Sequence, residues 1–250
     1  MSLLSFGLYL NNRGAVFLPD YSLDHLLDQA VEAEALGFEE IQLDYIRFPV
    51  DEGIRLAHFP ARDERPRWEV LHGLLERVDR AIRIPLGVDV FGLTAFDFGE
   101  TDVLGQDVER WTDVVEVITP MLYLHAMRGW GVGLDDRAAR LVRTGTAQLR
   151  TRIGPVPVIR PFLQSFPNSA DDPSPEFIAD QIRGARQGRA DGFLFWHPGS
   201  NYGLLRRGMQ GPAREETPFT LRGRDEARAD RWRERLALRG GATGSARLAD

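Results

Sequence analysis

The sequence predicts an α/β fold with a parallel sheet. Short apolar segments alternate along most of the chain with amphipathic segments of helical period, which is typical of βαβ units. Most of the apolar segments are apolar at nearly every position, as strands buried on both faces of a sheet should be. Both observations indicate parallel strands that are connected by helices.

Six strands are predicted, each a short apolar segment. They cover residues 4–10, 38–48, 84–92, 114–123, 156–164 and 191–197. Helices are predicted over 23–36, over 66–82, over 105–113, over 136–150 and after residue 174. The first helix carries apolar residues at helical spacing, namely Leu23, Leu26, Leu27, Ala30 and Val31. In the last helix, Ser174 suits the N-cap and Pro175 the first turn.

The composition excludes several classes of function. The chain has 250 residues, which suits one large domain or two small ones. Its 31 basic and 37 acidic side chains give a formal net charge of −6 without a basic stripe, so nucleic acid is not an expected partner. No apolar segment approaches the roughly 20 residues that a membrane span needs. Cysteine and lysine are absent, which excludes disulfides, thiolate nucleophiles, lysine Schiff bases and a P-loop lysine.

Residues 1–211 are predicted to form one α/β domain. Residues 212–250, rich in Arg, Glu and Gly, are predicted to form a polar tail that is partly helical or disordered. The first residues make a poor signal peptide, because no basic residue precedes their short apolar stretch. The sequence as written therefore indicates the cytoplasm, whereas a start further upstream would allow an extracytoplasmic location.

Polar and aromatic side chains follow the predicted strands at the point where each strand ends. Because the carboxyl ends of parallel strands meet at one edge of a sheet, we expect these side chains to form one site. In chain order, the predicted site residues are Asp44, Arg47, Asp89, Tyr123, His125, Arg160, Gln164, Trp196 and His197.

Asp44 and Asp89 are the candidate catalytic residues. Each lies between apolar neighbours, and a carboxylate in a buried strand is costly unless it is paired or functional. An ion pair of Asp44 with Arg47 or Arg160 is the structural alternative. On neighbouring strands, the two carboxylates would fall within the roughly 5–9.5 Å that glycoside hydrolysis requires. Asp44 would then be the nucleophile or base, and Asp89 the acid.

The aromatic residues at the strand ends together favour a sugar ligand, because flat rings stack on pyranose faces, although core packing is the better explanation for any one ring taken singly. The chain has no HxH, HExxH or HxxxH pair, so no metal is expected. Convergence of Asp44, Asp89, His125 and His197 on a metal is the alternative. No Gly-x-Gly-x-x-Gly segment follows a predicted strand, and no cofactor is expected.

Six segments in order carry a resemblance to a known family. They are EIQLDYIRFP at 40–49, GVDVFGL at 87–93, LGQDVE at 104–109, ITPMLYLH at 118–125, IRPFLQSF at 159–166 and FLFWHPGSNY at 193–202. Together they resemble the putative glycoside hydrolase domain family of bacterial TIM-barrel proteins. The resemblance implies that Asp44 and Asp89 match the aspartates of the family's DYIRFP and ADVFG strands. It also implies that Arg160 and Gln164 match the Arg and Gln of its RPWLQDF strand.

The sequence departs from the family in three respects. Ser165 and Phe162 stand where the family has an aspartate and a tryptophan, and His197 stands where we expect an asparagine. Six predicted strands are fewer than the eight of a closed (β/α)₈ barrel. We therefore expect a TIM-barrel-like parallel α/β barrel that is incomplete or truncated at its N-terminus. The explanations left open are a late gene start, closure by irregular segments or as a homodimer, and a decayed relative that binds sugar without cleaving it.

The leading hypothesis is a glycoside hydrolase that cleaves a polysaccharide or oligosaccharide with the aspartate pair. Arg47 and Arg160 are expected to tune the carboxylates and to contribute to substrate binding. The other residues expected to bind sugar are Tyr123, His125, Gln164, Trp196 and His197. The alternative is a non-catalytic carbohydrate-binding protein with a degenerate barrel, and metal-dependent hydrolysis of another ester or amide is a third hypothesis.

Overall fold

The computed structural model describes residues 7–11, 23–49, 64–97, 101–127, 129–131, 133, 136–167 and 174–216 of the chain. The beginning of the predicted strand 4–10 and most of the predicted polar tail, residues 217–250, lie outside the described residues.

Parallel strands form the centre of the fold. Five of them pair in the order β1-β2-β3-β4-β5, and β6 pairs with β7 in a second sheet. The strands are β1 (Gly7–Asn11), β2 (Glu40–Asp44), β3 (Leu86–Val90), β4 (Val117–Pro120), β5 (Val158–Ile159), β6 (Phe162–Gln164) and β7 (Leu194–Trp196). A bridge between Met121 and Phe162 connects the two sheets. Each predicted strand is found, and the segment 156–164 is divided into β5 and β6 at Pro161, which has no N–H to donate.

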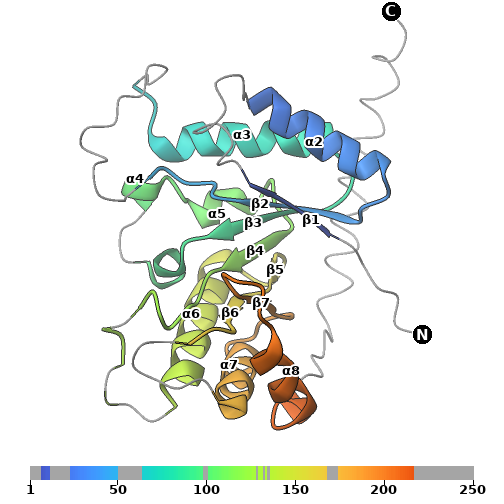
Figure 1. Ribbon diagram of the computed structural model, residues 1–250. Coiled ribbons are helices and arrows are strands. Elements are labelled where there is room, and N and C mark those ends of the chain that lie inside the picture. Colours follow the sequence, from blue (N-terminus) through green and yellow to red (C-terminus); the bar gives the residue numbers. More distant parts are fainter. Residues whose placement is uncertain are drawn as a thin grey trace, which may run out of the picture.

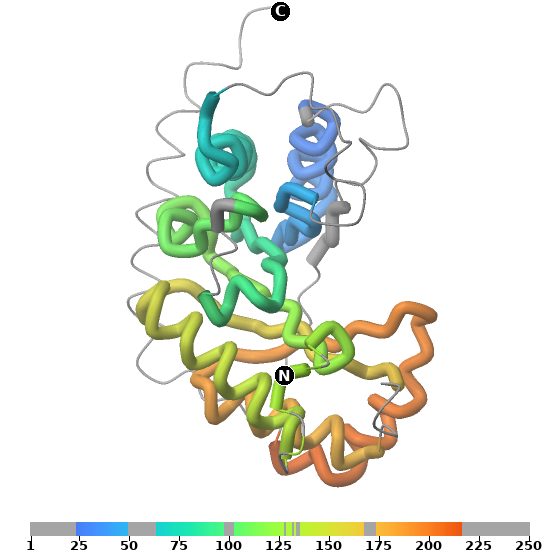
Figure 2. The backbone as a smooth tube through the Cα atoms, turned by 90° about the vertical axis from the view of Figure 1, so that its left-hand side faces the viewer, coloured from blue at the N-terminus to red at the C-terminus, as the bar shows by residue number. Residues whose placement is uncertain are grey.

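Helices lie around the outside of the curled sheet, with α2 and α3 above it and α6, α7 and α8 below it in the view of Figure 1 (Figures 1 and 2). The α-helices are α2 (Leu23–Ala35), α3 (Arg67–Ala81), α4 (Thr101–Leu104), α5 (Val108–Trp111), α6 (Arg137–Ile153), α7 (Pro175–Gln187) and α8 (Gly203–Gln210). Two 3₁₀ helices, η2 (Gly92–Phe96) and η3 (Arg214–Glu216), complete the elements of the described residues. None of the described helices combines the length and the apolar character that crossing a membrane requires.

The helix predictions succeed where an apolar stripe or a cap is clear. At α7, the Ser174 side chain accepts a hydrogen bond from the Phe177 N–H at 3.3 Å, and Pro175 opens the helix as predicted. The helix predicted over 105–113 is shorter, because α5 begins after Asp107, whose side chain caps it. Helix α8 and η2 were not predicted.

An ion pair between Glu40 of β2 and Arg160, which follows β5, shows how strongly the sheet curls. Strands β2 and β5 are separated by β3 and β4, and neighbouring strands lie about 4.8 Å apart. Side chains that stand upright on a flat sheet would not meet across three such spacings. The Glu40 carboxylate lies over Gly87 of β3, where a Cβ atom would come within 3.5 Å of it. The interior of a barrel therefore lies on the face that carries Glu40.

The barrel is not closed by the strands of the described residues, among which β1 pairs only with β2 and β7 only with β6. This confirms the expectation of an incomplete, TIM-barrel-like parallel fold with about six strand positions.

Two glycines allow α6 and α7 to pack closely. A Cβ atom on Gly184 would lie 2.3 Å from the Ala139 carbonyl oxygen, and one on Gly188 would lie 2.7 Å from the Arg143 carbonyl oxygen. Such distances are far below van der Waals contact. The two helices can therefore approach only if these positions lack side chains.

We predict that Gly184→Ala lowers the free energy of unfolding by about 1–3 kcal/mol, because α6 and α7 must move apart. Gly73→Ala is the matched control, since Gly73 also lies in a helix but has no heavy atom within 4 Å of its Cβ position. The control should gain about 0.5–1 kcal/mol from helix propensity. Urea denaturation of both variants tests the prediction, and equal stabilities would contradict it.

A double-mutant cycle tests the ion pair that spans the sheet. Glu40→Gln and Arg160→Met should each destabilise the protein, because each leaves the other side chain partly buried without its partner. The double variant should lose less than the sum of the single variants, with a coupling of about 1 kcal/mol or more in the free energy of unfolding. Additive losses would mean that the pair does not stabilise the curled sheet.

Candidate functional site

The carboxyl ends of β2, β3 and β4 bring three polar residues to one level. Leu43 pairs with Val88 in the parallel register, so Asp44 and Asp89 follow at the next position of each strand. Asp89 in turn pairs with Thr119 of β4. Paired residues of neighbouring parallel strands face the same side and lie about 4.8 Å apart. The structure thus brings both predicted catalytic aspartates to one rim of the sheet.

Asp89 is 1% exposed, and its Oδ1 atom accepts a hydrogen bond from the Gln42 Nε2 group. Gln42 lies on β2, two residues before Asp44, and therefore on the same face. Sequence reasoning missed this residue because it treated most strands as apolar at nearly every position. The signal was the alternation of Glu40, Gln42 and Asp44 with two aliphatic residues.

Asp44 is 3% exposed and is held by the chain that follows it. The Tyr45 N–H donates to Asp44 Oδ1 at 2.7 Å. Tyr45 has φ 57°, in the left-handed region that residues other than glycine seldom occupy. Unfavourable backbone geometry of this kind is common at functional sites.

The two arginines that sequence reasoning considered as partners of Asp44 lie among acidic and aromatic side chains. The Arg160 guanidinium pairs with Glu40 on the inner face of the barrel. The Arg47 guanidinium lies 5.6 Å from the centre of the Tyr45 ring and 5.5 Å from that of Phe91, at cation–π distance. Arg47 therefore lies between aromatic rings that follow β2 and β3.

Gln106, a fully buried residue that sequence reasoning did not single out, ties the ends of β2 and β3 together. Its Oε1 atom accepts hydrogen bonds from the Phe91 N–H at 2.8 Å and from the Thr94 hydroxyl at 3.0 Å. Its Nε2 group donates to the carbonyl oxygens of Ile46 at 3.0 Å and Asp89 at 3.4 Å. The only signal in the sequence was its place in the LGQDVE motif.

Tyr123 lies within electrostatic range of both aspartates. Its pKa is raised above the ordinary value of a phenol, first by burial and then by the negative charges of Asp89 and Asp44. The phenol therefore keeps its proton at neutral pH and can donate a hydrogen bond. Thr119, level with Asp89, is buried, and its hydroxyl has no hydrogen-bond partner among the described residues.

Gln164 connects β6 with the loop after β4. It accepts a hydrogen bond from the His125 N–H at 2.8 Å and donates to the Phe166 carbonyl oxygen at 2.9 Å. Gln181 of α7 fixes the Gln164 backbone from the other side, by one bond to its N–H and one to its carbonyl oxygen. The contacts of Gln164 thus position backbone around the site, and its predicted role in substrate binding stays a prediction.

Trp196, at the end of β7, belongs to an aromatic cluster. Its ring stacks on Tyr123 with a centroid distance of 5.5 Å and an interplanar angle of 27°, and the edge of Phe166 meets it at 5.3 Å. The Ser165 hydroxyl donates to the Trp196 carbonyl oxygen at 2.8 Å. The residue that replaces the family's aspartate thus joins β6 to β7.

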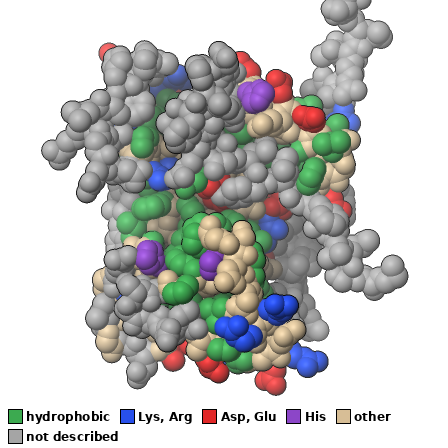
Figure 3. Space-filling view, in the orientation of Figure 1, with side chains coloured by type: hydrophobic (Ala, Val, Ile, Leu, Met, Phe, Trp, Pro, Cys, Tyr) green, Lys and Arg blue, Asp and Glu red, His purple; other side chains and the backbone are tan. Residues whose placement is uncertain are grey.

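His197 holds the turn after β7. Its Nδ1 atom accepts hydrogen bonds from the N–H groups of Gly199 at 3.0 Å and Asn201 at 3.2 Å. Nδ1 therefore carries no proton, and the neutral ring carries its proton on Nε2. The ring also contacts Phe166 and Tyr202 at centroid distances of 6.2 and 6.1 Å. Hydrophobic and histidine side chains gather near the middle of the face shown in Figure 3.

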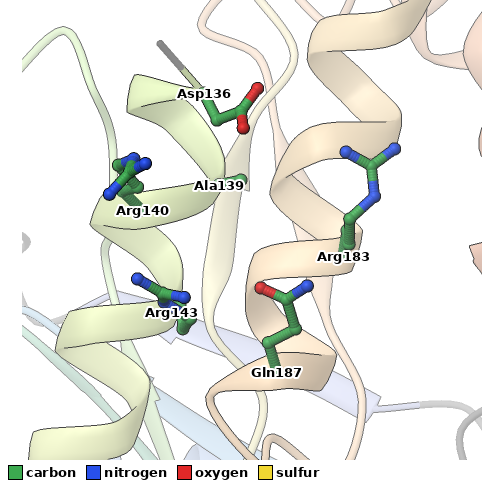
Figure 4. A pocket seen from close by; sticks show the side chains of 6 residues that line it. All are labelled: Asp136, Ala139, Arg140, Arg143, Arg183 and Gln187. Carbon is green, nitrogen blue, oxygen red and sulfur yellow. The ribbon is translucent and has the colours of Figure 1, made fainter. Parts of the chain in front are cut away.

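A separate pocket of about 180 Å³ lies on the outside of the fold, between α6 and α7 (Figure 4). Its lining consists of Asp136, Ala139, Arg140, Arg143, Arg183 and Gln187. Arg183 is already paired with Asp180 and Glu216. None of the predicted site residues lines this pocket. Within the described residues, no group of three or more His, Asp or Glu side chains is placed to hold a metal ion.

Comparisons with solved structures show the same type of fold. The glycoside hydrolase domain of PgaB (BpsB) from Bordetella bronchiseptica has a TM-score of 0.54 at 11% identity, over 80% of this chain and 62% of that one. The spore cortex-lytic enzyme SleL of Bacillus megaterium QM B1551 has a TM-score of 0.55 at 12% identity, over 88% and 61%. SleL of Bacillus cereus has a TM-score of 0.52 at 14% identity, over 87% and 60%. The chain thus spans about three fifths of the length of each of these structures.

No curated protein matches the chain in sequence. A family model does, over residues 7–202, and its description is "Putative glycosyl hydrolase domain". The matched region contains all nine predicted site residues and every strand of the sheet. The chain belongs to this glycosyl hydrolase domain family.

Proposed function

We propose that the protein hydrolyses glycosidic bonds of an oligosaccharide or polysaccharide, with Asp44 and Asp89 as the reacting carboxylates. One observation carries the proposal: the two aspartates lie at the same level of adjoining parallel strands, within electrostatic range of the protonated phenol of Tyr123. Family membership supports the reaction class. The spacing of about 4.8 Å between neighbouring strands brings two such carboxylates to a single glycosidic bond.

In the proposed reaction, Asp89 gives its proton to the glycosidic oxygen while the bond from that oxygen to the anomeric carbon breaks. Asp44 either attacks the anomeric carbon or takes a proton from the attacking water. If Asp44 attacks, a glycosyl ester forms, and water then breaks its bond to the anomeric carbon while Asp89 takes the proton of that water. The water oxygen ends on the anomeric carbon, and two shorter sugars leave. Gln42 and Gln106 act as positioning residues, since Gln42 orients the Asp89 carboxylate and Gln106 fixes the backbone after both strands.

Two hydroxyl groups are suited to bind the sugar next to the carboxylates. The Tyr123 phenol stays a donor because burial and the carboxylates raise its pKa. Leaving the buried Thr119 hydroxyl unsatisfied costs about 1–3 kcal/mol, and a substrate hydroxyl would relieve this cost. His125, Trp196 and His197 lie on the aromatic side of the site and are proposed to contact the substrate.

Arg47 and Arg160 contribute at different depths in this proposal. Arg47 lies at the rim, among rings that follow β2 and β3, and is proposed to contact substrate. Arg160 is proposed to influence the carboxylates from deeper in the barrel, because its guanidinium is paired with Glu40 on the inner face. Gln164 supports the loop that carries His125.

Asp44→Asn and Asp89→Asn should each lower hydrolysis by about 10²–10⁴-fold, the range for a lost acid or base. The measurement is reducing-sugar release from a panel of polysaccharides and aryl glycosides. Asp113→Asn, an exposed position, is the matched control and should keep wild-type activity. Thermal unfolding curves confirm that all three variants are folded.

The results separate the functions that the sequence left open. Equal activity in the wild type and both site variants would remove the two-carboxylate mechanism. Glycan binding by calorimetry without turnover in the wild type would instead identify a carbohydrate-binding protein. That outcome is motivated by Ser165, which stands in place of the family's aspartate and bonds to the Trp196 backbone.

Tyr123→Phe should reduce the loss of stability at alkaline pH. Above about pH 10 the tyrosine ionises in the unfolded chain but not in the folded protein, so the unfolded state binds fewer protons. The wild type should therefore lose up to about 1.4 kcal/mol per pH unit more than the variant. Urea denaturation at pH 7 supplies the reference difference between the two proteins, and an unchanged difference above pH 10 would contradict the prediction.

A further inference from the structure

Trp196 combines two properties that seldom occur together: its ring is held rigidly, yet it is 40% exposed. Tyr123 covers one side of the ring by stacking, and Phe166 meets it edge-on. The backbone is fixed as well, because the Trp196 carbonyl oxygen accepts hydrogen bonds from both the N–H and the hydroxyl of Ser165. A large apolar surface kept in water at a fixed orientation is typical of a binding surface.

Tyr202 extends this surface beyond the strand. Its side chain is 41% exposed, and its ring contacts His197 at a centroid distance of 6.1 Å. His197 in turn fixes the turn that carries Tyr202, because its Nδ1 atom accepts the N–H groups of Gly199 and Asn201. The ring of Tyr202 therefore extends from a turn whose backbone is fixed by hydrogen bonds to His197.

The exposed surface is continuous with the aspartates. Tyr123 lies in the loop after β4, whose Thr119 pairs with Asp89, and its ring reaches Trp196, so this loop leads from the level of the carboxylates to the exposed rings. The same phenol stacks on Trp196. A sugar bound at the carboxylates would thus have the next sugar of its chain beside Trp196.

We infer that Trp196 and Tyr202 form a second sugar-binding subsite, which makes a chain of linked pyranoses the substrate rather than a single glycoside. This inference rests on the proposed function. The rings offer flat negative faces, which attract the C–H groups of a sugar. Pyranoses with mainly equatorial hydroxyls present such C–H faces, so β-linked chains of glucose-like sugars fit the surface. His197 is a positioning residue for this subsite.

The test compares the binding of sugar chains and of single sugars. The Asp89→Asn protein, full length, is titrated calorimetrically with the β-1,4-linked tetrasaccharides of glucose, N-acetylglucosamine, xylose and mannose, and with the four monosaccharides. At least one tetrasaccharide should bind ten or more times as tightly as its monosaccharide. Adding Trp196→Ala should abolish that advantage, whereas Trp196→Phe should lose only two- to threefold.

Trp68→Ala is the matched control, because Trp68 is an aromatic residue of α3 that packs against Arg110, on another part of the surface. It should leave the preference for tetrasaccharides unchanged, and thermal unfolding confirms that each variant is folded. A tetrasaccharide preference that survives Trp196→Ala would overturn the subsite while leaving the aspartate pair intact. Absence of binding by every tetrasaccharide to the parent protein would overturn both the subsite and the proposed function.

Discussion

The site depends on the parallel register between β2 and β3. A shift of one residue in either strand would turn Asp44 or Asp89 to the outer face, where the helices pack. Three contacts, one of them partly buried and the others buried, oppose such a shift, and each joins β2 or its loop to another part of the barrel. Gln42 bonds to Asp89, Glu40 pairs with Arg160, and Gln106 joins the segments that follow β2 and β3. The catalytic proposal and the curvature of the sheet therefore share one set of interactions.

Sequence reasoning could predict the parallel fold and the meeting of Asp44 and Asp89 at one rim of the sheet, because both depend on local signals. Apolar segments end in Asp44 and close to Asp89, and the carboxyl ends of parallel strands meet at one rim whatever the details of packing. It could not predict the residues whose contacts hold these aspartates and their strands in position. The Glu40–Arg160 pair joins positions 120 residues apart, and the bond from Gln106 to Ile46 joins positions 60 apart. Those contacts exist only once the sheet has curled.

Packing also explains the elements that were missed. Helix α8 begins and ends near glycines and carries consecutive arginines, so its sequence resembles the beginning of a polar tail. It forms because Gly208 lies directly against Ile178 of α7, where a Cβ atom would come within 2.6 Å. The role of Ser165 was also not predictable. In the sequence it stands where the resemblance to the family predicts an aspartate, and in the fold its hydroxyl forms a hydrogen bond that joins the end of β6 to β7. Neither the helix α8 nor the role of Ser165 can be assigned unless the element that each contacts, α7 or β7, is already known.

Gly87 of β3 shows how an ion pair that spans the sheet, between Glu40 and Arg160, can restrict the residue that lies beneath it. Its Cβ position has Val117 at 3.3 Å, the Glu40 carboxylate at 3.5 Å and Gln42 at 3.6 Å. Any branched or longer side chain at position 87 would displace the Glu40 carboxylate from the position in which it pairs with Arg160. Natural variation at position 87 should therefore follow the ionic partners at 40 and 160 rather than any demand for an unusual backbone. Replacing both of those groups with small neutral residues should relax the requirement for glycine.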